Sequence, residues 1–327
     1  MDPQKTTLVG RVLKSPHWER ARDWGEPRTG HPEGTIGRHV TQQLLPFIDR
    51  HYEELSEYWD LVMLAYLHDI GKPNTKYKDG HLEGDSHSEI SAQIAIELGA
   101  PEHLVKVIRS NDRAYSHWRK LLDSKGIFAP ARWTNERSEK FRLEFGDREL
   151  DLRLLVLFHR ADNASRRQLT GDEQTDPVLW FENRLLAEGL LKELPLEGKD
   201  QGLRWLPNYE IKTIEHVDFI KPWFLCEPGL EKELKREVAL NLQHPLFRVS
   251  ARSIARRHDT DDVLFVLENY KYPIARVHLT WVAPEFGIAP EFNKEWPSTD
   301  LFENWGDWVE RGMYPDADVW RLCEVDL

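Results

Sequence analysis

The sequence contains little cysteine, no long apolar run and no excess of positive charge. Two cysteines, Cys226 and Cys323, in 327 residues exclude a disulfide framework and a cysteine-rich zinc site. No apolar stretch exceeds eight residues, which is too short to span a bilayer, and the start "MDPQKTTLVG" has no apolar signal core. We therefore expect a soluble protein of a reducing cytoplasm, with no membrane attachment.

The charge balance is acidic. The chain has 44 Lys and Arg against 56 Asp and Glu, a formal net charge of -12. A general nucleic-acid-binding surface needs many cations to displace counterions from phosphates, so an extensive nucleic-acid coat is not expected. A small basic pocket for one phosphate group remains compatible with this balance.

The first part of the chain has helical periodicity throughout. Apolar residues recur at helical spacing in several segments, at 36–50, 60–70, 86–98, 101–109 and 148–167. Pro46 predicts a kink or an early end in the first of them, because proline lacks an amide donor. Asp85 or Ser86 is the candidate N-cap of the third helix, and Gly99 its predicted end. We predict an all-helical region up to about residue 192.

The pattern changes after a Pro-, Gly- and charge-rich stretch, "ELPLEGKDQG", at residues 193–202. The segment "DDVLFVLENYKYPIARVHLTWVAP" alternates and is rich in Val, Ile and aromatics, which predicts two strands joined around "ENYKYP". We therefore predict an α+β protein of two domains: an all-α domain over 1–198 and a smaller α+β module over 199–327. The tryptophans near the C-terminus indicate either core packing or an exposed aromatic surface.

The stretch "LVMLAYLHDIGKP" places His68 and Asp69 at the end of an apolar helix. Neighbouring helical positions diverge by about 100° around the axis, so one metal ion can sit between such a pair. His39 and Asp162 lie at the edges of apolar stripes on other helices and are the candidate further ligands, because a buried polar side chain needs a partner. A second His-Asp pair, His258-Asp259, precedes an acidic turn, and we expect it to be a solvated strand end.

Four motifs occur together in a characteristic order: "HPEGTIGRHV", "LHDIGKP", "SHSEISAQIA" and "HRADNASR". In this order and rough spacing they resemble the HD superfamily of metal-dependent phosphohydrolases. They are most similar to the HD domain of bacterial CCA-adding tRNA nucleotidyltransferases, over about residues 28–168. The resemblance implies that His39, His68, Asp69 and Asp162 bind a divalent metal ion.

The resemblance also implies roles around that ion. Asp69, Lys72 and His87 would be catalytic, and Lys72 would neutralise a phosphate oxygen. His87 would contact substrate or act as a general acid-base. Independently of the resemblance, Arg166 lies one turn after Asp162 and is expected to bind a phosphate group, and Asn111 is a further expected substrate-binding residue. Many family members carry His where this chain has Asn111, and Asn is a poor ligand for transition metals. We therefore expect one metal ion per site, which could be Mn, Co, Ni, Fe or Mg.

The function that this resemblance implies is hydrolysis of a phosphate ester in a nucleotide or an RNA end, by attack of metal-activated water on phosphorus. One alternative is a non-catalytic HD module that senses a nucleotide and binds a protein partner through residues 199–327. Asn111 mildly favours that alternative. A smaller alternative is oxidation by a two-iron variant of the fold, which Asn111 makes less favourable.

Overall fold

The computed structural model describes residues 3–27, 34–78, 81–119, 133–165, 176–193, 211–217, 219–239, 241–281 and 297–325. The chain folds into two compact units, Met1–Trp205 with Asp326 and Leu206–Val325 with Leu327. The predicted domain boundary between residues 198 and 199 lies outside the described residues and stays a prediction. Within the described part of the chain, no helix is long and apolar enough to cross a membrane.

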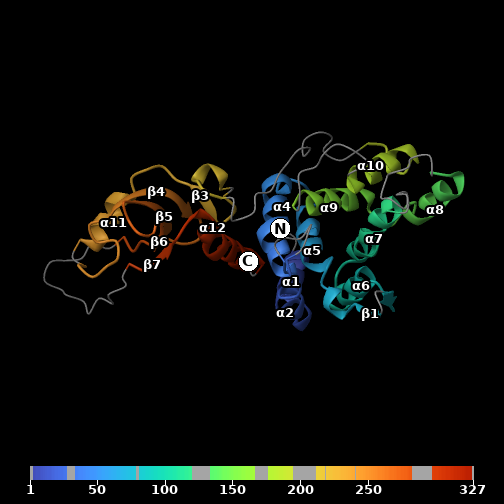
Figure 1. Cartoon of the computed structure of the whole chain (residues 1–327), viewed down its shortest axis with the longest axis horizontal. Coiled ribbons are helices and arrows are strands. Elements are labelled where there is room, and N and C mark those ends of the chain that lie inside the picture. Colours follow the sequence, from blue (N-terminus) through green and yellow to red (C-terminus); the bar gives the residue numbers. More distant parts are fainter. Residues whose placement is uncertain are drawn as a thin grey trace. The chain divides into compact units, whose positions relative to one another are not determined.

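The first unit is almost entirely helical (Figure 1). Its described helices are α1 (Pro3–Leu13), α2 (Pro16–Arg22), α3 (Ile36–His39), α4 (Leu45–Tyr52), α5 (Tyr58–Leu67), α6 (His87–Glu97), α7 (Glu102–Arg119), α8 (Asn135–Phe145), α9 (Leu152–Ala164) and α10 (Pro177–Ala187). The prediction of an all-helical region was wrong in one detail. A short antiparallel hairpin, β1 (Lys76–Lys78) with β2 (His81–Glu83), interrupts the helices between α5 and α6.

Pro46 does not end its helix, so of the two predicted outcomes, a kink or an early end, the early end is wrong. A π-helical turn, Val40–Leu44, joins α3 to α4, and the Leu45 amide donates to the Val40 carbonyl five residues back. Proline has no amide donor, and its ring would clash with the carbonyl four residues before it in a regular α-helix. The wider turn relieves this clash, so the chain stays helical from Ile36 to Tyr52. A π-helical turn, Val309–Met313, also precedes Pro315 in the second unit.

The ends of α6 follow the predicted signals. The Ser86 hydroxyl accepts a hydrogen bond from the Glu89 amide, so Ser86 rather than Asp85 is the N-cap. The helix ends at Gly99, whose φ of +76° is a conformation that glycine adopts without strain. Both boundaries come from local chemistry, which explains why the sequence alone predicts them.

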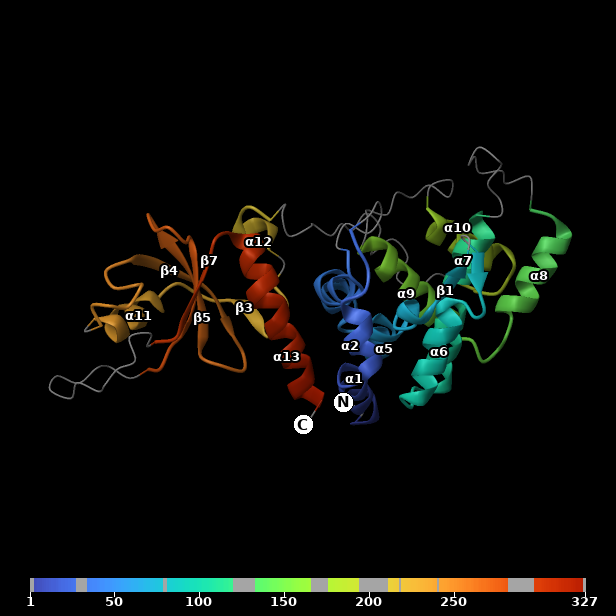
Figure 2. The same ribbon diagram turned by 60° about the horizontal axis from the view of Figure 1, so that its bottom comes forward.

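The second unit is built around an antiparallel sheet (Figure 2). Its strands lie in the order β3 (Trp223–Leu225), β4 (Ser250–Arg257), β5 (Asp262–Glu268), β6 (Ile274–His278) and β7 (Thr299–Phe302). The helices α11 (Glu231–Val238), α12 (Trp305–Trp308) and α13 (Tyr314–Val325) complete it. The predicted pair of strands around "ENYKYP" is confirmed as β5 and β6. The α+β fold class is confirmed with it.

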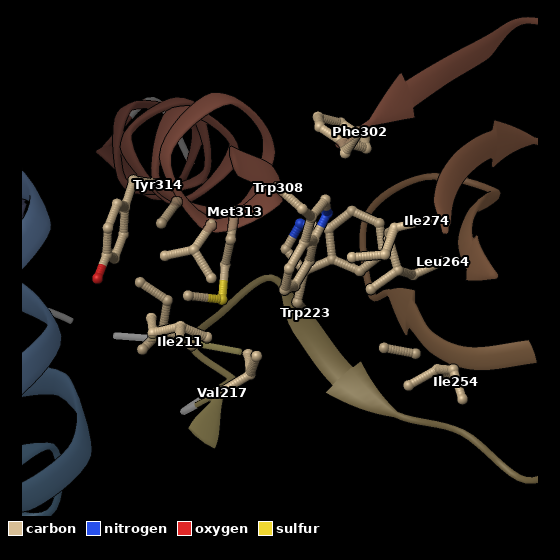
Figure 3. Packing of buried hydrophobic residues seen from close by; sticks show 14 residues of the cluster. Ile211, Val217, Trp223, Ile254, Leu264, Ile274, Phe302, Trp308, Met313 and Tyr314 are labelled. Atoms are coloured by element: carbon tan, nitrogen blue, oxygen red, sulfur yellow. The ribbon is translucent and has the colours of Figure 1, made fainter. Parts of the chain in front are cut away.

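Side chains cover both faces of this sheet. On one face, Leu264 belongs to a buried cluster that also contains Trp223 and, from the C-terminal helices, Trp308 and Met313 (Figure 3). On the other face, Phe265 packs with residues of α11. The tryptophans near the C-terminus differ in exposure: Trp308 is fully buried, whereas Trp281 is 44% exposed. Trp296 lies outside the described residues.

Candidate metal centre

Three predicted ligands from three parts of the first unit meet in its interior. His39 is the last residue of α3, His68 follows α5, and Asp162 lies on α9. One nitrogen of each histidine and one oxygen of Asp162 all lie within 4.8 Å of one another. The three residues are no more than 3% exposed, so the cluster is sealed from bulk water on most sides.

The position of His68 follows from the packing of α5. Every residue from Leu61 to Leu67 is buried, so the last two turns of this helix have no solvent-facing side. His68 caps its C-terminus, and its amide donates to the Leu64 carbonyl. Because these turns are packed on all sides, the end of the helix is a well-supported base for the imidazole.

The imidazole of His68 is oriented by backbone carbonyls. Nδ1 lies 3.0 Å from the Ala65 carbonyl and 3.2 Å from that of Leu64, so Nδ1 carries the proton and donates it. Nε2 therefore presents its lone pair to the cluster. This atom is buried and makes no hydrogen bond of acceptable geometry within the described part of the chain, although Asp69 Oδ2 lies 3.2 Å away. An unsatisfied buried acceptor is costly unless a cation or a donor faces it.

His39 is likewise supported at Nδ1, but its Nε2 contacts a carboxylate. Its Nδ1 lies 3.3 Å from Gln43 Oε1, and its Nε2 lies 2.9 Å from Asp162 Oδ1. Gln43 lies in the π-helical turn, so the widened turn supplies the side chain that supports His39. Metal-binding histidines typically donate their second nitrogen to such a partner. Two imidazole nitrogens and one carboxylate oxygen form a donor set that fits a divalent transition metal ion.

Asp69 lies beside the group of three. Its Oδ2 is 3.2 Å from His68 Nε2 and forms a salt bridge with Lys72 Nζ. Its Oδ1 is 3.6 Å from His87 Nε2. The structure therefore brings Asp69, Lys72 and His87 to one edge of the cluster, with the Lys72 ammonium bound to Asp69.

Electrostatics favour the ionised form of Asp69. Burial alone would raise the pKa of Asp69, but His68 and Lys72 outweigh it and hold the pKa well below its usual range. Burial would lower the pKa of His68, yet the carboxylates of Asp69 and Asp162 raise it above its ordinary value. The carboxylates thus give the pocket a negative potential that favours a bound cation.

The remaining predicted residues that the structure describes do not belong to the group of three ligands. Asn111 on α7 is buried, and its Oδ1 has no hydrogen-bond partner among the residues that the structure describes. Its backbone carbonyl accepts a hydrogen bond from His159 Nε2 at 3.0 Å. Arg166 lies outside the described residues. His117 binds Glu144 and therefore does not replace the histidine missing at position 111.

Sequence reasoning missed Asp112. Its Oδ2 lies 2.8 Å from His87 Nε2, closer to that imidazole than the Asp69 carboxylate is. Asp112 lies on α7, and its side chain is 42% exposed. In the sequence it looks like any solvent-exposed acidic residue of a helix. Only the folded arrangement of α6 and α7 distinguishes it.

The geometry agrees with a comparison of the sequence with known families. The family model of the HD domain matches residues 50–165. This segment is similar to HD domains. It contains His68, Asp69 and Asp162, while His39 precedes it. HD domains typically belong to metal-dependent hydrolases of phosphate esters and bind divalent metal ions.

No curated protein and no solved structure matches the chain. The similarity to the HD domain of CCA-adding enzymes therefore stays a prediction from the motifs.

Proposed function

We propose that the protein is a metal-dependent phosphohydrolase that acts on a phosphate ester of a nucleotide or an RNA end. One observation carries the proposal: His39, His68 and Asp162 converge in the interior, and the buried Nε2 of His68 has no hydrogen-bond partner among the described residues. A bound divalent ion at such a site lowers the pKa of water and polarises a phosphoryl oxygen.

The chain's own residues have distinct roles in this proposal. His39, His68 and Asp162 hold the ion, and Asp69 lies close enough to His68 to join them. Lys72 neutralises a phosphoryl oxygen after exchanging its contact with Asp69 for one with the substrate. His87, with a side chain 22% exposed, lies at the accessible edge and can give a proton to the leaving oxygen. Arg166 stays a proposed phosphate ligand.

The alternative is a module that senses a nucleotide without turning it over. Asn111 in place of a ligand residue favours it, and so does the direct salt bridge between Lys72 and Asp69. In either case residues 199–327 are proposed to select the substrate or a protein partner. We also propose a cytoplasmic location, on the basis of the two cysteines in the sequence.

Phosphate release from a panel of nucleotides, cyclic nucleotides and short RNAs, with Mn, Co, Ni or Mg added, tests the proposal. We expect metal-dependent turnover that is lost in Asp69→Ala and kept in Asp23→Ala, which removes an exposed carboxylate of the same unit. Metal and nucleotide binding without any turnover would instead support the sensing module. Equal activity in Asp69→Ala and the wild type would contradict the proposed site.

A further inference from the structure

The His87 backbone is clamped against the turn that follows Asp69. The Gly71 amide donates to Ser91 Oγ at 2.9 Å, and a Cβ added to Gly71 would meet the His87 carbonyl oxygen at 2.8 Å and the Ser91 amide nitrogen at 2.5 Å. Only glycine permits this approach between the turn and the first turns of α6. The contact places the backbone of His87, but it leaves the imidazole free to rotate about its side-chain torsions.

Two ion pairs connect α6 to α7. His87 Nε2 lies 2.8 Å from Asp112 Oδ2, and the Arg109 guanidinium lies 3.0 to 3.1 Å from the carboxylate of Glu89. Both pairs are partly exposed and join the same two helices. Only the first involves a side chain that reaches Asp69, because His87 Nε2 is also 3.6 Å from Asp69 Oδ1.

We propose that Asp112 is a positioning residue that holds the His87 imidazole against Asp69 at the accessible edge of the metal centre. This inference rests on the proposed function, since it gives His87 its orientation in that reaction. A carboxylate that fixes a partly exposed imidazole restricts its rotamer, and a site needs such support from surrounding side chains. Asp112 acts through His87 and does not itself contact the three clustered ligands.

The two ion pairs provide matched variants. Asp112→Ala removes the support of His87, whereas Glu89→Ala breaks the neighbouring pair between the same helices. We expect kcat to fall about ten-fold or more in Asp112→Ala with a smaller change in KM, as for other supporting residues of metal sites. Glu89→Ala should stay close to the wild type. Asp112→Asn should recover part of the loss, because the amide oxygen can accept the same hydrogen bond.

A double-mutant cycle tests whether Asp112 works through His87. In a His87→Ala background, Asp112→Ala should cause little further loss of kcat, because the side chain that it positions is already absent. Independent losses that multiply would overturn the proposal. Equal losses in Asp112→Ala and Glu89→Ala would also overturn it, since they would indicate general loosening of α6 against α7.

Chemical modification gives a readout that does not depend on turnover. Diethyl pyrocarbonate labelling of the full chain, read at His87 by peptide mass spectrometry, should be several-fold faster in Asp112→Ala than in the wild type and unchanged in Glu89→Ala. Equal labelling rates in all three proteins would overturn the positioning role. If the wild type shows no turnover, the proposed function fails, and the labelling still decides whether Asp112 holds His87.

Discussion

His68 is fully buried and yet keeps one polar atom without a hydrogen-bond partner among the described residues. Such an atom costs about 1–3 kcal/mol of stability when nothing compensates it. Its other nitrogen is bound to backbone carbonyls of α5, so the ring cannot rotate to relieve this cost. A side chain held in this way is better explained by a ligand role than by packing.

Another buried histidine, His244 in the second unit, shows the opposite case. Its Nδ1 accepts a hydrogen bond from the Leu246 amide, and its Nε2 lies 3.0 Å from the Pro297 carbonyl. The neutral ring satisfies both contacts, whereas a protonated ring would lose the acceptor. Burial accordingly lowers the pKa of His244, although the bond to Pro297 partly opposes this.

The second unit should therefore lose stability in mild acid. The unfolded chain binds a proton at His244 near its ordinary pKa of about 6.5, and the folded chain binds it only at lower pH. The free energy of unfolding should fall as the pH drops below that value. Denaturant unfolding between pH 7.5 and 5 measures this, with a weaker pH dependence expected in His244→Asn. An unchanged dependence in that variant would assign the effect to other groups, and exposed His258→Asn is the control.

At the scale of elements, α9 contributes Asp162 to the metal centre and contacts both of its histidines. Phe158 packs edge-on against the His68 ring, with centroids 5.2 Å apart, and Asp162 contacts His39. Arg160 forms a paired salt bridge with Glu182 of α10, and both side chains are at most 4% exposed. Three residues of one helix, Phe158, Arg160 and Asp162, thus contact different neighbouring elements and fix the rotation of α9.

Removing one partner of the buried salt bridge should be strongly destabilising. Arg160→Met leaves the Glu182 carboxylate buried without its cation, which costs about 3–5 kcal/mol in comparable pairs. Adding Glu182→Leu should recover most of the loss, because the uncompensated charge is gone. Chemical denaturation of the single and double variants measures both values. A double variant as unstable as the single one would show that packing, and not charge, is lost.

The sequence predicts those elements that depend on local chemistry. The apolar stretch before His68, the Ser86 cap and the two strands on either side of "ENYKYP" all follow from nearby residues. The π-helical turn before Pro46 does not, because a proline inside a helical pattern normally indicates a kink or an end. Asp112 and the Arg160–Glu182 pair also escaped prediction. Their partners are 22 or more residues away in the chain, so only the tertiary structure shows what they contact.

At the scale of the molecule, the two compact units have separate tasks in this account. The clustered ligands all lie in the first unit, while the sheet and both of its packed faces lie in the second. A ligand that binds only the folded state of one unit stabilises that unit by mass action.

Added metal should therefore raise the unfolding temperature of the first unit and leave that of the second unchanged. Differential scanning calorimetry of the full chain, with and without Mn or Co, measures this shift. His68→Ala should abolish it, whereas His117→Ala, which removes a histidine bound to Glu144, should keep it. A metal-dependent shift confined to the second unit would place the ion elsewhere.

The metal content of the purified chain tests the central claim most directly. After exposure to Mn, Co or Ni and removal of loosely bound ions, inductively coupled plasma mass spectrometry should find about one ion per chain, because the donor atoms form a single cluster. The same measurement on His68→Ala should find almost none, with His117→Ala unchanged. Wild-type protein without bound metal, or His68→Ala with as much metal as the wild type, would contradict the account.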